Sequence, residues 1–324
     1  MNETLFYFLI LSLLTQLANS FRYIGWYLGD KTGIDNIPFD IYTHIVTGFP
    51  IVYDNGTVAC NKSDTVVQTI VNRSKEYGSI VQWRYGGPPV QDILWNSSNF
   101  YKRDNYLNSI GNALTECNID GIEVDFEWRD TKWSWGLVPY KDATVYTNFL
   151  KDLKIAVGPD RVVSADIGVP GFPQEYIFGF LPWINVDMLN RGDFDFINTM
   201  SYYWDRSGSI WSWKKDWYVL HKVWGIDVER INLGMPYYSM NRSGFKIVGE
   251  PVWTELSKKC PNIDPTLNVC EDLLIIGKEM NYNIGKFAAE RSFGGLFPWA
   301  MSYDSFENNN TMINWAKRGV DTIN

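Results

Sequence analysis

Three acidic residues alternate with apolar residues in one short segment of the chain. The acids are Glu123, Asp125 and Glu127, and the apolar residues of the segment are Ile122, Val124 and Phe126. Successive side chains of a β-strand point to opposite faces, so the three carboxylates share one face, about 6–7 Å from each to the next. Buried carboxylates at that spacing share protons, which keeps an acid available near neutral pH. The segment predicts a buried strand that performs acid–base chemistry, rather than an edge strand with a solvated acidic face.

Strand and helix patterns alternate along the rest of the chain. Strands are predicted at 22–28, 44–52, 79–83, 118–128, 161–169, 194–203, 231–237 and 294–299, and helical spacing at 66–77, 106–117, 146–157 and 272–280. Eight such units without a linker or internal repeat predict an α/β protein, a single (β/α)₈ TIM barrel without a large insertion domain. Barrel active sites lie at the carboxyl ends of the strands, where Glu127 and Trp128 end the acidic strand. The alternative, an open doubly wound sheet, requires a Gly-rich phosphate turn that residues 25–29 do not provide.

Composition narrows the class of partner. The formal net charge of −8 argues against a nucleic-acid or anionic-membrane partner. Aromatic residues make up 16% of the chain, and their flat rings suit the apolar faces of sugars as well as protein cores. The only histidines, His44 and His221, lie far apart in apolar surroundings, so we expect both to be structural. No metal and no cofactor is expected.

The first 20 residues have the pattern of a signal peptide. An apolar run at 5–18 is too short to span a bilayer comfortably, and Ala18-Asn19-Ser20 provides a cleavage site before Phe21. An uncleaved anchor is the alternative. We therefore predict residues 1–20 as a signal peptide and 21–324 as the catalytic barrel. We expect the mature protein to be a secreted monomer, extracellular or in the lumen of the secretory pathway, without stable membrane association.

Cysteines and glycosylation sequons fit an oxidising compartment. The four cysteines match no zinc spacing and allow three pairings. The pairing that closes a short Pro/Asn-rich loop is Cys260 with Cys270, which leaves Cys60 with Cys117. Asn-x-Ser/Thr sequons occur at Asn55, Asn61, Asn72, Asn96, Asn241 and Asn309. These features favour a secreted glycoprotein with disulfide bonds.

The segment Asp120-Gly121-Ile122-Glu123-Val124-Asp125-Phe126-Glu127 resembles the signature Asp-Gly-x-Asp-x-Asp-x-Glu of glycoside hydrolase family 18, the chitinase family. Glu123 stands where the family usually has Asp. Residues 81–87 resemble the Ser-x-Gly-Gly segment of the third strand, with Arg84 in place of Ser. Residues 196–202 resemble the Met-x-Tyr-Asp segment of the sixth strand, with Tyr203 in place of Asp. Residues 233–237 and Trp299 resemble the seventh and eighth strands, so the resemblance spans nearly the whole mature chain.

The resemblance implies a residue-by-residue mechanism. Glu127 would be the general acid, and Asp125 would orient the substrate's own N-acetyl group, whose carbonyl oxygen attacks the anomeric carbon. Glu123 would take part in proton relay along the strand, and Tyr202 would donate a hydrogen bond to the acetamide. This retaining, substrate-assisted scheme needs no protein nucleophile. The residues implied in substrate binding are Trp299, Trp128, Tyr237 and Gly87.

The expected activity is hydrolysis of β-1,4 linkages next to N-acetylglucosamine, in chitin or related oligosaccharides. The connection between Tyr238 and the eighth strand is short, which predicts an open groove and endo cleavage. Two alternatives stay open at this point: an endo-β-N-acetylglucosaminidase acting on N-glycan cores, and a chitinase-like lectin without catalysis. We also hypothesise a salt bridge between Arg84 and Glu123.

Overall fold

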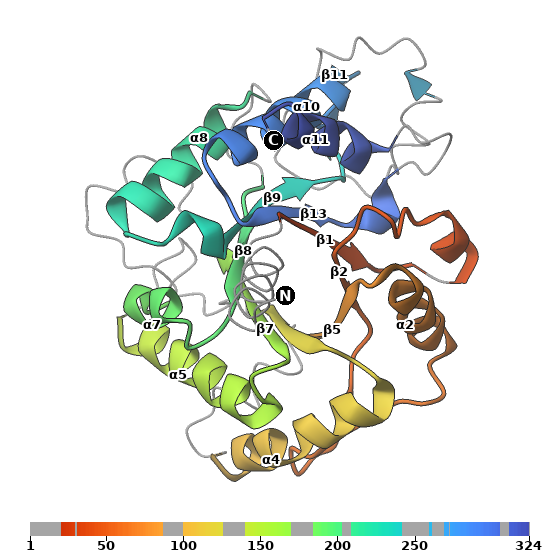
Figure 1. Ribbon diagram of the computed structural model, residues 1–324, viewed down its shortest axis with the longest axis vertical. Helices are drawn as coiled ribbons and strands as arrows, with labels where there is room; N and C mark the ends of the chain where they lie inside the picture. Colours follow the sequence, from red (N-terminus) through yellow and green to blue (C-terminus); the bar gives the residue numbers. More distant parts are fainter. Residues whose placement is uncertain are drawn as a thin grey trace, which may run out of the picture.

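Eight parallel strands close into a barrel in the computed structural model, which describes residues 21–29, 31–86, 100–125, 140–169, 184–202, 209–241, 259–260, 269–271, 273–304 and 311–323. Around the barrel the order is β1-β13-β9-β8-β7-β6-β5-β2. The strands are β1 (Arg22–Tyr27), β2 (His44–Thr47), β5 (Ile80–Gly86), β6 (Gly121–Asp125), β7 (Val162–Gly168), β8 (Phe196–Met200), β9 (Ile231–Pro236) and β13 (Gly295–Trp299). The predicted single (β/α)₈ barrel is confirmed, with its helices arranged outside the strands (Figure 1).

The helices follow the strands in chain order. They are α2 (Thr65–Tyr77), α4 (Phe100–Cys117), α5 (Tyr140–Val157), α7 (Val186–Arg191), α8 (Trp211–Trp217), α10 (Lys278–Glu290) and α11 (Met312–Asp321). Short helical turns are η1 (Lys31–Asn36), η4 (Tyr218–Val223), which continues α8, η5 (Val228–Arg230) and η6 (Met301–Tyr303). Small antiparallel sheets join β3 (Ile51–Val52) to β4 (Val58–Ala59), and β12 (Leu273–Leu274) to both β10 (Met240–Asn241) and β11 (Val269–Cys270).

Several predicted boundaries differ from the structure, and two of these differences have a clear local cause. The helix predicted at 272–280 begins only at Lys278, because Leu273 and Leu274 pair with β10 and β11 instead. The helix continues to Glu290, and its buried face includes Met280, Ile284 and Phe287. The strand predicted at 44–52 ends at Thr47, since Gly48 has a φ of +62°, which turns the chain out of the extended conformation.

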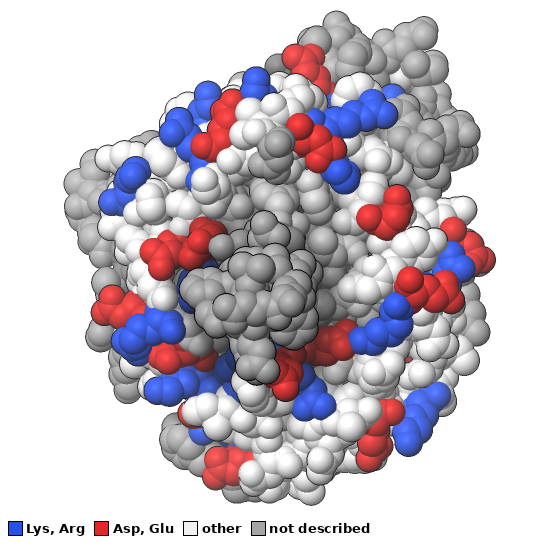
Figure 2. Space-filling view, viewed as in Figure 1, with Lys and Arg blue, Asp and Glu red and all other residues white. Residues whose placement is uncertain are grey.

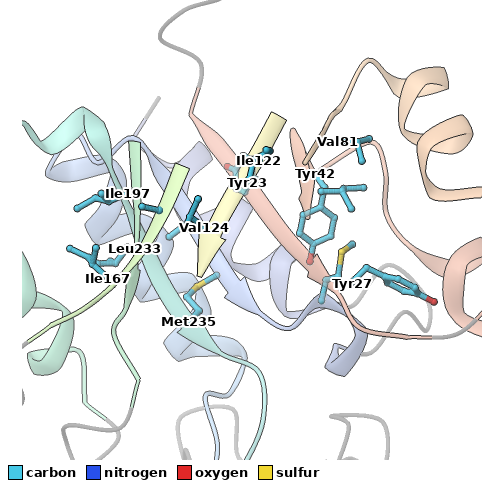
Figure 3. Packing of buried hydrophobic residues seen from close by; sticks show 14 of the residues in the cluster. Tyr23, Tyr27, Tyr42, Val81, Ile122, Val124, Ile167, Ile197, Leu233 and Met235 are labelled. Carbon is cyan, nitrogen blue, oxygen red and sulfur yellow. The ribbon is translucent and has the colours of Figure 1, made fainter. Parts of the chain in front are cut away.

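Apolar side chains pack in two layers, one on each side of the barrel wall. The larger layer lies between the strands and the helices, and it includes Ile122, Val124, Ile167, Ile197 and Leu233 (Figure 3). A smaller cluster fills the barrel interior, with Trp26, Val46, Phe196 and Phe297 among its members. Because Ile122 and Val124 face the helices, Glu123 and Asp125 on the same strand face the interior. All five residues of β6 are buried, which confirms the predicted buried strand.

The entry to β6 is fixed by Asp120. One carboxylate oxygen accepts a hydrogen bond from the backbone N–H of Val81, with 2.8 Å between N and Oδ2. The other forms an ion pair with Lys75 at the end of α2. Asp120 therefore ties the start of β6 to β5 and to α2. These contacts fix the position of Glu123 and Asp125 along the barrel axis.

Both histidines serve structural roles. His44 Nδ1 lies 2.8 Å from Thr43 Oγ1, and its ring packs edge-on against Phe196. Burial, together with the nearby Arg22, lowers the pKa of His44 to about 3, so this imidazole is neutral. His221 Nδ1 lies 2.9 Å from the carbonyl oxygen of Ile226.

The four cysteines form two disulfides. Cys60 is bonded to Cys117, at the end of α4, and Cys260 is bonded to Cys270. This is the pairing that the short loop favoured. No helix in the described ranges has the length and apolar character needed to cross a membrane. The predicted signal peptide at 1–20 and the sequons at Asn96 and Asn309 lie outside those ranges.

Candidate active site

Glu123 is held inside the barrel by donors from two other strands. The indole Nε1 of Trp26, on β1, donates a hydrogen bond to Glu123 Oε1 at 3.1 Å. The amide Nδ2 of Asn198, on β8, donates to the same oxygen at 3.2 Å. Asn198 is in turn oriented by Asn232, on β9, whose Nδ2 lies 2.9 Å from Asn198 Oδ1. Glu123 is fully buried, so these bonds fix its carboxyl group in a single orientation.

A further buried carboxyl faces Glu123 from the neighbouring strand. Asp166 lies on β7, directly beside Asp125 in the parallel ladder, and its buried side chain interacts with Glu123. Burial raises the pKa of Glu123 to about 7, and the negative charge of Asp125 acts in the same direction. Burial also raises the pKa of Asp166 well above its usual range, with a further contribution from Glu123. Because the two carboxyls interact, the titration of each depends on the charge of the other.

Asp125 is paired with a cation, unlike Glu123. Arg84 Nη2, on β5, donates to Asp125 Oδ2 at 3.0 Å, and both side chains are largely buried. The guanidinium carbon lies 4.4 Å from the ring centroid of Trp26 and 5.2 Å from that of Phe49. These cation–π contacts hold the Arg84 side chain over the carboxyl end of the barrel.

The hypothesised salt bridge between Arg84 and Glu123 is wrong, because Arg84 pairs with Asp125 instead. The two residues are directly opposite each other in the β5–β6 ladder. Glu123 Oε1 accepts hydrogen bonds from Trp26 and Asn198, whereas the long Arg84 side chain extends along the strands to Asp125. The positive charge of Arg84 still acts on Glu123 through space and offsets part of the rise that burial causes in the pKa of that carboxyl.

Close packing of the backbone accompanies this ion pair. A Cβ atom on Gly86, at the end of β5, would lie 1.9 Å from the carbonyl oxygen of Asp125. Only glycine permits that approach without displacing one of the two strands. Gly86 therefore allows the ends of β5 and β6 to lie close together where Arg84 meets Asp125.

Aromatic rings gather at the carboxyl ends of β8, β9 and β13. The Trp299 ring centroid lies 6.4 Å from that of Tyr202, 5.1 Å from that of Tyr238 and 5.9 Å from that of Tyr303. Tyr202 and Trp299, two of the residues predicted from the sequence, are thus brought together. Flat rings clustered in this way suit the apolar face of a sugar ring.

Tyr237 lies elsewhere. Its side chain belongs to the cluster between strands and helices, and burial raises the pKa of its hydroxyl well above the usual range, with Asp304 and Tyr42 adding to the effect. Its backbone N–H bonds the Trp299 carbonyl at 3.0 Å, so it supports the end of β13. The neighbouring Tyr238 is the residue whose ring contacts Trp299.

Four residues singled out from the sequence lie outside the described ranges, namely Gly87, Glu127, Trp128 and Tyr203. Because Glu127 lies outside the described ranges, its role as general acid stays a prediction. No group of three or more His, Cys, Asp or Glu side chains in the described ranges is arranged to hold a metal ion.

Sequence reasoning missed Trp26, Asp166 and Asn198. Strand alternation carried a signal for two of them. In the segment 162–168, Ser164 and Asp166 alternate with Val163, Ala165 and Ile167, the same division of faces seen in β6. Asn198 likewise lies between Ile197 and Thr199 on β8. The relation of these side chains to Glu123 depends on neighbouring strands in the barrel, which a single strand's pattern does not reveal.

The fold and the site together define a (β/α)₈ barrel with a row of interior carboxyls and an aromatic group at the carboxyl ends of its strands. The model of glycosyl hydrolases family 18 matches residues 22–256. The chain belongs to this family. No curated protein matches the chain in sequence.

Solved structures of similar fold include chitinases. A chitinase from Bacteroides thetaiotaomicron has a TM-score of 0.72 at 18% identity, with 93% of this chain and 97% of that chain covered. A family 18 chitinase from Cycas revoluta, solved with (GlcNAc)₃, has a TM-score of 0.70 at 16% identity, covering 93% and 99%. YKL-39, solved in the presence of chitooligosaccharides, has a TM-score of 0.67 at 16% identity, covering 93% and 99%. At these identities the similarity establishes the fold.

Proposed function

We propose that this protein is a secreted, endo-acting glycosidase of the chitinase type, which hydrolyses β-1,4 linkages next to N-acetylglucosamine. The observation that carries the proposal is Asp125, a buried carboxyl at the carboxyl end of β6, two positions before Glu127. Membership of family 18 and the chitinase structures of the same fold support it. The two disulfides support passage through an oxidising compartment.

The proposed reaction proceeds in two steps. Glu127 protonates the glycosidic oxygen while the acetamide oxygen of the substrate bonds to the anomeric carbon and the glycosidic bond breaks. Asp125 orients the acetamide nitrogen and stabilises its developing positive charge. Water then attacks the anomeric carbon, Glu127 accepts a proton from that water, and the acetamide bond to the anomeric carbon opens. Two displacements on opposite faces retain the anomeric configuration.

The aromatic group supplies the proposed sugar subsite. Trp299 would lie beneath the sugar ring whose bond is cut, and the Tyr202 hydroxyl would donate a hydrogen bond to the acetamide oxygen. Tyr238, which lies against both rings, would hold them in place. Trp128 and Gly87 remain proposed contacts of the substrate, and Tyr237 would act through its backbone bond to Trp299.

Endo cleavage follows from the connection between β9 and β13. Its described part includes three two-residue strands and α10. A groove without high walls would admit a long saccharide chain and release products of several lengths. Early products from a chitin hexamer, separated by chromatography, are expected to be mixed. Dimer as the dominant product from the first time point would contradict the endo assignment.

The test of the proposed function is product release from chitooligosaccharides by the wild-type protein and by Glu127→Gln. We expect the turnover number to fall by about 100- to 10,000-fold in the variant, because general acid catalysis is lost, while saccharide binding is retained. The matched control is Glu116→Gln, which removes an exposed carboxylate on α4 and should leave turnover unchanged.

Other outcomes would assign a different function. Binding of chitooligosaccharides by both proteins without turnover by either would identify a lectin. Absence of both binding and turnover would exclude a chitooligosaccharide substrate, and release of the glycan from an N-glycosylated protein would then identify an endo-β-N-acetylglucosaminidase.

A further inference from the structure

Asp166 is a buried carboxyl that the proposed mechanism does not use. It lies beside Asp125 in the β6–β7 ladder, and its side chain faces Glu123. It is 2% exposed, which leaves no access for bulk water to solvate a charge. Three carboxyls thus meet in the barrel interior, with Arg84 as the cation among them, and Arg84 is bonded to Asp125.

The hydrogen bonds indicate which carboxyl of the facing pair carries a proton. A contact between two carboxyls needs one of them to be a donor. Glu123 Oε1 accepts from both Trp26 and Asn198, which favours the ionised form of Glu123. Glu123 Oε2 and Asp166 Oδ1 are buried without an N–H donor in the described part of the chain. A proton held on Asp166 and donated to Glu123 satisfies this arrangement.

We propose that Asp166 is a positioning residue of this hydrolase, which carries a proton and donates it to Glu123, so that Glu123 and Asp125 stand as fixed carboxylates behind the reacting sugar. This inference rests on the proposed function. Asp125 is held by Arg84 and Glu123 by Asp166, so these two carboxylates each have their own partner. Without the Asp166 proton, two carboxylates would face each other in the barrel interior, and their repulsion would displace Glu123 toward Asp125.

Charged and titratable groups surround Asp166 on several elements. Glu123 and Asp125 face it from β6, and the charge of Arg84 reaches Glu123 from β5. Tyr146 lies behind the sheet on α5, and burial, then the charges of Asp166 and the other two carboxyls, keep the pKa of its hydroxyl well above the usual range. Trp26 and Asn198, which also bond the carboxyl pair, do not titrate in this pH range. The proton is therefore shared by Asp166 and Glu123.

Two variants separate a proton donor from a mere space-filling side chain. Asp166→Asn keeps the volume and an N–H donor toward Glu123, whereas Asp166→Ala removes the donor. We expect Asp166→Asn to retain turnover within about 3-fold of wild type, and Asp166→Ala to lose about 10-fold in the turnover number with little change in KM. Equal turnover in both variants and the wild type would overturn the positioning role.

The proton itself is tested by thermal unfolding without substrate. Because the pKa values of the pair are raised in the folded state, the folded protein binds more protons than the unfolded chain above about pH 4, and wild-type stability falls as pH rises through this window. Asp166→Asn removes one titrating carboxyl of this pair. Its Tm minus that of the wild type should therefore increase from about pH 4 to about pH 8.

The matched control is Asp187→Asn, which removes an exposed carboxyl at the start of α7 and should give a Tm difference that changes little with pH. A Tm difference for Asp166→Asn that is independent of pH would overturn the buried proton. If the wild-type protein hydrolyses no saccharide, the proposed function and the catalytic part of this inference are both overturned. The melting curves would still show whether Asp166 holds the proton.

Discussion

Arg84 shows how one residue changes the charge balance of the acidic row. Family 18 segments of this kind resemble Ser-x-Gly-Gly, and this chain has a guanidinium in place of the small hydroxyl. Its positive charge is placed against Asp125 and held by the rings of Trp26 and Phe49. A buried carboxylate without such a partner is strongly destabilising. The arginine therefore makes a buried, ionised Asp125 possible in this barrel.

Arg84→Ser is expected to lower both stability and turnover. The substitution leaves Asp125 buried without its cation, and the free energy of unfolding should fall by about 3 kcal/mol in urea titrations at pH 7. The turnover number should fall as Asp125 loses its fixed orientation. Arg84→Lys, which retains the charge but loses the planar group over Trp26, should lie between the wild type and Arg84→Ser. Wild-type stability in Arg84→Ser would show that the ion pair contributes nothing.

At the scale of secondary structure, neighbouring strands bring the carboxyls together. β6 supplies Glu123 and Asp125, β5 supplies Arg84, and β7 supplies Asp166. The register of these strands is set at the other end of the barrel by Asp120, and the helix that leads into β6 is tied to β4 by the Cys60–Cys117 disulfide. Small shifts of α4 would therefore be transmitted to the height of the acidic row.

Removal of the two disulfides should have unequal effects. Cys60→Ser with Cys117→Ser opens a loop with a separation of 57 residues, and loop entropy predicts a loss of about 4 kcal/mol in unfolding free energy. The matched pair, Cys260→Ser with Cys270→Ser, opens a separation of 10 residues and should cost about 3 kcal/mol. Chemical denaturation of the two double variants measures both values. A larger loss from the shorter loop would contradict this ordering.

At the scale of the whole molecule, surface charge has little part in the proposed recognition. The chain carries a formal net charge of −8, and on the described part of the face in Figure 2, Lys and Arg are interspersed with Asp and Glu. A neutral saccharide gains no long-range attraction from such a surface. Binding would depend instead on stacked rings and on hydrogen bonds inside the barrel, which salt screens weakly.

The KM for chitooligosaccharides should therefore be nearly independent of ionic strength. We expect a change of less than about 2-fold between roughly 0.05 M and 0.5 M sodium chloride at constant pH, because the Debye length affects mainly exposed charges. Initial rates at both salt concentrations, with sodium sulfate as a second salt at matched ionic strength, provide the measurement. A steep rise of KM with salt would indicate that exposed charges bind the substrate.

The amino-acid sequence by itself determined the fold class and the position of the acidic strand, and it favoured the disulfide pairing that the structure has. These features follow from local patterns: alternation in a strand, repetition of strand and helix, and the short spacing between two cysteines. Helix boundaries were less accessible, since the apolar residues 273 and 274 fit a helix as well as a strand until their antiparallel partners are known.

Only the tertiary structure decided which side chains meet. Arg84 and Glu123 are opposite in register, yet the ion pair forms with Asp125, and Glu123 is bonded instead by Trp26 and Asn198. Asp166 acquires its relation to Glu123 only when β7 lies beside β6. Closure of the barrel brings residues from distant segments into one buried interior, and the charge of each group there depends on its neighbours in space rather than in sequence.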